Sequence, residues 1–162
     1  METKLINIDK IPSEQELISL LGKKSYEYYR TICENIILLL SPDIELWDYA
    51  GRRGKYFHGY QINKKAITIY QYLSSTSIYK QVTCELHFTK RLFIKILKQR
   101  NSLNSKQIQE DIDFSIKFNS EFGGGYTVNV IIRDEETFKD VIKMIKIISS
   151  RPRPDEFEIR QQ

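Results

Sequence analysis

The chain has 162 residues, of which 41% are apolar and 28% are charged, and its formal net charge is +4. This length fits one domain better than two, and the apolar fraction is too high for a disordered chain. The charge excess is mild, so it permits an anionic partner but lacks the strong basic bias of a dedicated nucleic-acid binder.

Apolar residues three and four positions apart predict five helices. The first begins in a capping box, in which the Ser13 hydroxyl accepts from the Glu16 amide and the Glu16 carboxylate reaches back, and it stops at Gly22. A longer helix follows, with an apolar face from Tyr29 to Leu40. The other three are expected from 89 to about 101, from 104 or 105 onward, and from a cap at Asp134 to about 150.

Alternating residues predict five strands, at 44–50, 55–62, 66–73, 78–88 and 126–133. Short links join the first four, and the Gly51 to Gly54 segment is typical of a tight turn. Four strands joined in this way form an antiparallel meander. In the fourth strand Val82, Cys84 and Leu86 share one side, while polar side chains, His87 among them, share the other.

The predicted fold class is α+β. We expect a single domain over residues 1–154, with an approximately five-stranded, mostly antiparallel sheet and helices packed on one face, in the order ααββββααβα. The opposite face, which carries polar and tyrosyl side chains, is expected to be partly open to solvent. Residues 155–162 are expected to form a mobile polar tail, and the strand at 66–73 an exposed edge that supports homodimerisation.

Several segments resemble a bacterial family known as domain of unknown function 3788, over about Leu21 to Pro154. The resemblance rests on Leu21-Gly22-Lys23, on Trp47 with the stretch from Gly51 to Gly59, on Gly124-Gly125-Tyr126 with the strand after it, and on the last helix running into Arg151-Pro152-Arg153-Pro154. Members of the family usually carry Lys-Trp where this chain has Gly125-Tyr126. The family has no established activity, so the resemblance supports the fold and implies no mechanism.

The candidate ligand-contacting residues lie on one predicted hairpin. Its basic tip offers guanidinium forks to a phosphate or carboxylate, and its aromatic residues offer rings for stacking. These residues are Trp47, Arg52, Arg53, Lys55, Tyr56, His58 and Tyr60. The alternative is a solvated hairpin tip followed by packed aromatic side chains. We therefore expect a non-enzymatic binding domain whose partner is a small anionic or aromatic molecule or another protein.

Two further functions stay open. The basic stretch from Lys90 to Lys106 is a less favoured surface for nucleic acid, because acidic residues are interspersed nearby. An enzyme using His58 as acid or base is weaker still, because no companion residue can be named, and no catalytic residue is assigned.

No metal and no cofactor is expected. Cys33 and Cys84 lie among apolar residues as buried thiols, without a CxxC motif. The glycines at 123–125 lie between a helix and a strand, whereas a phosphate-binding loop lies between a strand and a helix. The start of the chain lacks the apolar region of a secretory signal, and the apolar run Ile36–Leu40 is too short for a membrane span. We therefore expect a cytoplasmic protein that has no membrane partner.

Overall fold

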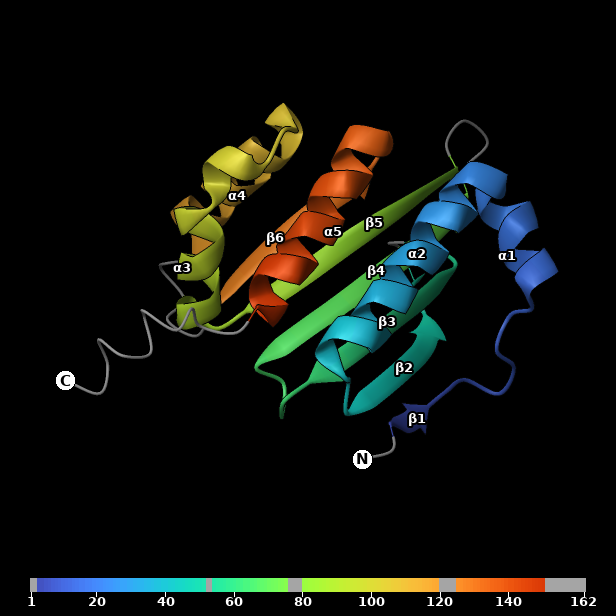
Figure 1. The fold of residues 1–162 in the computed structure, drawn as a ribbon. Helices are drawn as coiled ribbons and strands as arrows, with labels where there is room; N and C mark the ends of the chain where they lie inside the picture. The colour runs from blue at the N-terminus through green and yellow to red at the C-terminus, as the bar shows by residue number, and fades with distance from the viewer. Residues whose placement is uncertain (1–2, 52–53, 76–79, 120–124, 151–162) are drawn as a thin grey trace.

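A computed structural model describes residues 3–51, 54–75, 80–119 and 125–150, as an open sheet with helices packed against one face (Figure 1). The elements in chain order are β1 (Lys4–Ile6), α1 (Glu14–Leu21), α2 (Lys23–Leu40), β2 (Ile44–Tyr49), β3 (Tyr56–Ile62), β4 (Ile67–Ser75), β5 (Lys80–Phe88), α3 (Lys90–Lys98), the short 3₁₀ helix η2 (Arg100–Ser102), α4 (Lys106–Asn119), β6 (Tyr126–Ile132) and α5 (Glu135–Ser149). The α+β class is confirmed. The expected tail at 155–162 lies outside the described residues.

Within the described residues the sheet has six strands, in the spatial order β1-β2-β3-β4-β5-β6. Each neighbouring pair from β2 to β6 is antiparallel, so the predicted meander is confirmed. The sequence analysis missed β1, which pairs parallel to β2. This strand has three residues, all of them exposed, so it has no alternating apolar side that a sequence pattern could reveal. The expectation that residues 66–73 form an edge is wrong, because β4 lies between β3 and β5.

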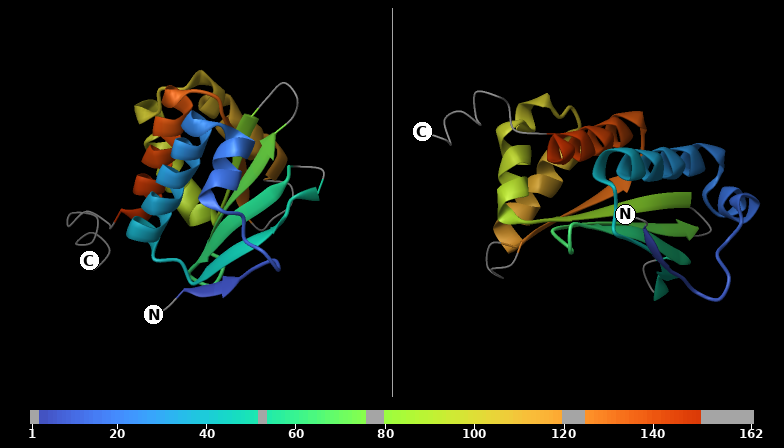
Figure 2. Two further views of the ribbon diagram at one scale, coloured as in Figure 1. Left: turned by 90° about the vertical axis from the view of Figure 1, so that its right-hand side faces the viewer. Right: turned by 60° about the horizontal axis from the view of Figure 1, so that its bottom comes forward.

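Side-chain alternation assigns each strand residue to one of two faces. Residues directly opposite each other in antiparallel strands point to the same side. Trp47, His58, Gln71, Cys84 and Val130 are opposite one another in turn and form one row across β2 to β6. This row lies on the face that α2 and α5 cover, as the edge-on views in Figure 2 show.

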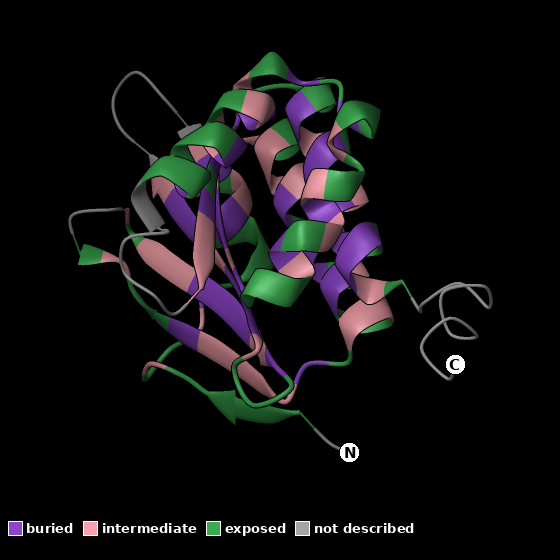
Figure 3. Ribbon diagram, turned by 90° about the vertical axis from the view of Figure 1, so that its left-hand side faces the viewer, coloured by how far each residue is buried: buried purple, intermediate pink, exposed green. Residues whose placement is uncertain are grey.

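The core fills the layer between the sheet and the helices. Ile32 and Ile36 of α2, Leu86 of β5 and Ile145 of α5 are all fully buried there. Figure 3 shows buried residues on the inner sides of the helices and on the sheet, with exposed residues on the outer sides of the helices. The apolar stripes that predict the helices are therefore the stripes that pack on the sheet.

Three of the predicted helix starts have the expected caps. The side chains of Ser13, Thr89 and Asp134 accept hydrogen bonds from the backbone amides three residues later. Gly22 ends α1 with a positive φ of 81°, and α2 begins at the next residue. The helix expected up to residue 101 is shorter, because α3 ends at Lys98 and the chain continues into η2.

The opposite face of the sheet carries a layer of aromatic and polar side chains. The Phe57 ring lies 4.5 Å from the Tyr70 ring and 5.2 Å from the Tyr72 ring, measured between centroids. Tyr70 lies across Gly59, its direct partner on β3. Phe57 and Tyr70 are half-buried, which agrees with the prediction of a partly open face.

Candidate functional site

A cluster of polar and aromatic side chains lies between α2 and the sheet, and all of them are buried except Glu45, whose side chain is 30% exposed. Two members come from α2, two from β2, two from β3 and one from β4. This buried polar cluster consists of Tyr29, Cys33, Glu45, Trp47, His58, Tyr60 and Gln71. Buried polar groups are stable only when they are hydrogen-bonded, so the partners of each decide what the cluster can do.

His58 lies at the centre of the buried polar cluster. Its Nε2 is 3.2 Å from Oε1 of Glu45, and its Nδ1 is 2.6 Å from the hydroxyl of Tyr29. The Trp47 ring stacks on the imidazole, with 3.9 Å between centroids and an interplanar angle of 11°. A carboxylate only accepts hydrogen bonds, so Nε2 carries the proton and Nδ1 accepts from Tyr29. The imidazole is therefore a fixed, neutral link between β2, β3 and α2.

The protonation states within the cluster follow from burial. Burial lowers the pKa of His58, and the hydrogen bond from His58 lowers the pKa of Glu45. Burial also raises the pKa of Cys33 to about 12, and raises the pKa of the Tyr29 phenol. At neutral pH the cluster therefore contains one carboxylate, a neutral imidazole and a protonated thiol. A thiol held in this form is a poor nucleophile.

The surroundings of His58 do not suit acid or base catalysis on a substrate. The residue is 4% exposed, and it lines neither the cleft beside α1 nor the cleft at the end of β5. A catalytic base must come within hydrogen-bond distance of a substrate proton. Glu45 supplies a carboxylate partner, but packing closes the imidazole off. We therefore assign His58 a structural role.

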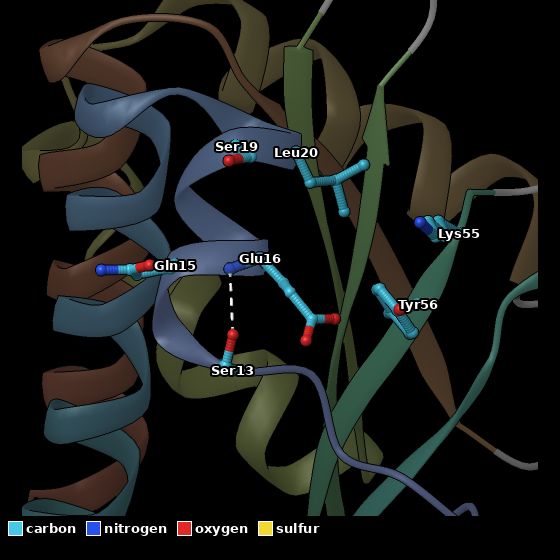
Figure 4. A pocket seen from close by; sticks show the side chains of 7 residues that line it. All are labelled: Ser13, Gln15, Glu16, Ser19, Leu20, Lys55 and Tyr56. Carbon is cyan, nitrogen blue, oxygen red and sulfur yellow. Dashed lines mark hydrogen bonds between the residues drawn. The ribbon is translucent and has the colours of Figure 1, made fainter.

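A cleft lies between α1 and the start of β3, and we call it the α1–β3 cleft (Figure 4). Its volume is about 560 Å³. The lining residues are Ser13, Gln15, Glu16, Ser19, Leu20, Lys55 and Tyr56. Two of these, Lys55 and Tyr56, belong to the candidate site predicted from sequence.

The α1–β3 cleft has charges of both signs on facing walls. Glu16 and Leu20 extend from α1 toward the strand, as Figure 4 shows. On the other wall, the Lys55 ammonium lies 5.5 Å from the centroid of the Tyr56 ring. The Tyr56 ring is itself 6.1 Å from the Tyr49 ring, at an interplanar angle of 29°. Glu16 also lies 3.7 Å from Lys10, between exposed side chains, an ion pair that contributes little.

Three of the other predicted site residues, Trp47, His58 and Tyr60, do not line an open surface. Trp47, His58 and Tyr60 are 6%, 4% and 3% exposed, because their side of the sheet is the one that α2 covers. Tyr56 shares that side but lies at the end of its strand, where the cleft begins. Arg52 and Arg53 lie outside the described residues.

Sequence reasoning missed the α1 wall of the cleft and the partners of His58. A sequence pattern could have indicated the Tyr29–Cys33 pair, which is spaced for one helix face, and Glu45, which shares a side of β2 with Trp47. No local pattern indicates that α1 lies beside β3, since this depends on how the helices pack.

The basic helix surface proposed for nucleic acid is partly engaged in contacts within the domain. The Lys95 ammonium donates to the carbonyl of Ser150, and Arg100 forms an ion pair with Asp113 at 2.6 Å. Phosphate binding would compete with these contacts. Nucleic-acid association through this surface stays a prediction, and the structure does not favour it.

Comparisons with known proteins found no match among family models, curated proteins or solved structures. The resemblance to domain of unknown function 3788 therefore stays a prediction. Over the described ranges, no group of three or more His, Cys, Asp or Glu residues is placed to hold a metal ion. None of the helices described has the length and apolar character needed to cross a bilayer.

Proposed function

We propose that the protein is a binding domain that holds a small molecule with one anionic group and a ring in the α1–β3 cleft. The observation that carries this proposal is the placement of the Lys55 ammonium beside the Tyr56 ring on one wall of a cleft of about 560 Å³. This volume falls within the range of about 300–1,000 Å³ that is usual for small-molecule sites.

The lining supports a ligand of limited charge. Lys55 can pair with a carboxylate or phosphate, while the Tyr56 ring offers a face for stacking. Glu16 on the opposite wall repels a second anionic group and accepts a hydrogen bond from an amine or hydroxyl. A ring compound with one acidic and one donor group therefore fits better than a polyanion.

The buried polar cluster supports this binding wall from behind. His58 follows Tyr56 by two residues on the same side of β3, and it is tied to α2 through Tyr29 and to β2 through Glu45. These bonds fix the strand that begins at Tyr56, directly after Lys55. A binding site gains affinity when its side chains are held in place before the ligand arrives.

The α1–β3 cleft is built for binding more than for turnover. Its lining in the described structure contains one carboxylate and one ammonium, but neither an imidazole nor a thiol. General acid and base catalysis near neutral pH needs a group with a suitable pKa close to the reacting atoms. Recognition of a small molecule is the role that these side chains support.

The proposal can be tested by titrating 4-hydroxybenzoate, phenylalanine and adenosine monophosphate against the protein by calorimetry and thermal shift. Binding of at least one probe should weaken roughly tenfold or more in Lys55→Met and Tyr56→Leu, equivalent to about 1.4 kcal/mol. Lys64→Met, a matched change of an exposed lysine outside the cleft, should bind as the wild type does. Absence of binding by all three probes, or equal binding by Lys55→Met, would overturn the proposal.

A further inference from the structure

A second cleft lies at the opposite end of the sheet from the α1–β3 cleft, and we call it the β5–β6 cleft. Its volume is about 330 Å³. It forms where the end of β5 meets the start of β6, close to the start of α3 and to the turn before β4. The lining residues are Lys65, Ala66, His87, Phe88, Thr89, Gly125, Tyr126 and Thr127.

Two side chains that line this cleft, Thr127 and His87, form a chain of hydroxyl, imidazole and carboxylate with Glu85 beside it. The Oγ1 of Thr127 is 2.7 Å from Nδ1 of His87, and Nε2 of His87 is 3.1 Å from Oε1 of Glu85. The sheet register creates this arrangement. Thr127 is directly opposite His87, and Glu85 precedes His87 by two residues, so all three point to the face that the helices leave uncovered.

One hydrogen bond and one close imidazole–carboxylate contact set the direction of proton transfer along this chain. The Glu85 carboxylate beside Nε2 favours the tautomer that carries its proton there, and in this tautomer the lone pair of Nδ1 faces Thr127. The Thr127 hydroxyl therefore donates to Nδ1. A hydroxyl bonded to an imidazole that is itself oriented by a carboxylate is the arrangement of an activated nucleophile. The Glu85 side chain is only 11% exposed, so its contact with His87 is shielded from water.

The rest of the cleft offers groups for an anionic substrate. Lys65 ends a run of three residues with positive φ, in which Asn63, Lys64 and Lys65 have φ of 51°, 55° and 71°. Such backbone is strained in residues other than glycine, and strain of this kind is often found at functional sites. Thr89 caps α3, where its oxygen accepts from the Leu92 amide and its own proton remains to be donated. Lys65 and Thr89 are thus the donors beside Thr127.

We propose that the β5–β6 cleft hydrolyses small carboxylic esters that carry an anionic group, with Thr127 as the nucleophile. Thr127 Oγ1 attacks the ester carbonyl carbon while His87 Nδ1 takes the hydroxyl proton. The carbon–oxygen bond to the alcohol breaks, and His87 returns that proton to the leaving oxygen. Water, activated by the same imidazole, then hydrolyses the acyl-threonine. One ester and one water give one acid and one alcohol, and the free side chains are restored.

This activity is independent of the binding function proposed above. The two clefts share no lining residue and lie at opposite ends of the sheet. Loss of ligand binding at Lys55 and loss of ester hydrolysis at Thr127 can therefore be observed separately. In the β5–β6 cleft Glu85 is a positioning residue, because it acts through His87.

The test is hydrolysis of 4-nitrophenyl acetate and of its anionic analogue, mono-4-nitrophenyl succinate, followed by release of nitrophenolate. Thr127→Val and His87→Gln should lower kcat/KM at least tenfold, whereas Thr127→Ser should retain turnover. Lys65→Met should raise KM for the succinate ester only, and Glu85→Gln should lower kcat and alter its pH profile. Thr83→Val, the matched change of a threonine on the same face of β5, should hydrolyse both esters as the wild type does.

Mass spectrometry of the protein quenched during turnover locates the acyl group. The proposal requires an acyl adduct on Thr127 that is missing in Thr127→Val, with thermal unfolding confirming that the variants are folded. A wild-type rate equal to that of buffer would overturn it. Full activity in folded Thr127→Val, or acylation confined to lysine or tyrosine side chains, would overturn it as well.

Discussion

Gly59 determines how the uncovered face of the sheet is built. A Cβ placed there would lie 2.0 Å from Cδ1 and 2.8 Å from Cε1 of Tyr70, and 3.1 Å from the carbonyl oxygen of Ile69. The tyrosine ring therefore lies on the strand where a side chain would otherwise stand. We predict that Gly59→Ala forces this ring away from Phe57 and breaks the hydrogen bond that Gln61 donates to the Tyr70 hydroxyl at 3.2 Å.

Two opposing effects set the size of this change. Overpacking costs about 1–3 kcal/mol, whereas alanine in the middle of a strand is more favourable than glycine by about 0.5–1 kcal/mol. We therefore expect Gly59→Ala to lower the free energy of unfolding by about 1–2 kcal/mol. In a Tyr70→Ala background the ring is gone, so the same change should be close to neutral, because only the Ile69 carbonyl stays near.

Urea unfolding of the wild type, both single variants and the double variant gives the coupling between the two positions directly. A coupling of about 1–2 kcal/mol is expected, in the sense that the second change relieves the first. Tyr72→Ala supplies the control background, since Tyr72 contacts Phe57 and is not among the atoms nearest to a Cβ at Gly59. Equal losses from Gly59→Ala with and without the Tyr70 ring would refute the reasoning.

Three further predictions concern the interior. In the folded protein the pKa of His58 is lowered from 6.5 and that of Glu45 from 4.5. The stability that these two groups contribute is therefore present above those values and is lost as the pH falls. The free energy of unfolding in urea should be smaller at pH 5 than at pH 7.5, and equal values at the two pH values would contradict this. Asp140→Ala should lower the free energy of unfolding by about 2–4 kcal/mol, because the Asp140 carboxylate accepts hydrogen bonds from the backbone amides of Asn104 and Ser105, at 3.1 and 2.6 Å. Asp140→Asn should lower it less, and equal losses in the two variants would count against this account. Burial raises the pKa of Cys33 to about 12 and also raises the pKa of Cys84. A thiol reagent at pH 8 should therefore label both cysteines only in denaturant. Rapid labelling of the native protein would be inconsistent with buried thiols.

The local elements could be predicted because each is specified by its own residues. Ser13, Thr89 and Asp134 cap their helices through bonds to amides three residues later, which any sequence window contains. The two sides of each strand were likewise readable from alternation, as in the Val82 to Leu86 segment of β5. The short strand β1 could not be predicted in this way, because only its pairing with β2 defines it.

The candidate site was harder to predict, because alternation gives the two sides of a strand but not which side the helices cover. Alternation puts Tyr56 and His58 on one side of β3, yet α2 buries His58 and leaves Tyr56 at a cleft. Thr127 and His87 are 40 residues apart in the chain, and only the pairing of β5 with β6 brings them together. Pairing between distant strands is decided by tertiary packing, which no local pattern contains.

The three residues of β1 also protect the sheet. By pairing with β2, they occupy backbone donors and acceptors along part of a six-residue strand that would otherwise end the sheet. Removing the residues before position 8 would expose these backbone groups of β2 to strands of other molecules, which is a common route to intermolecular aggregation. Light scattering of such a shortened protein should therefore show association that the untrimmed chain avoids.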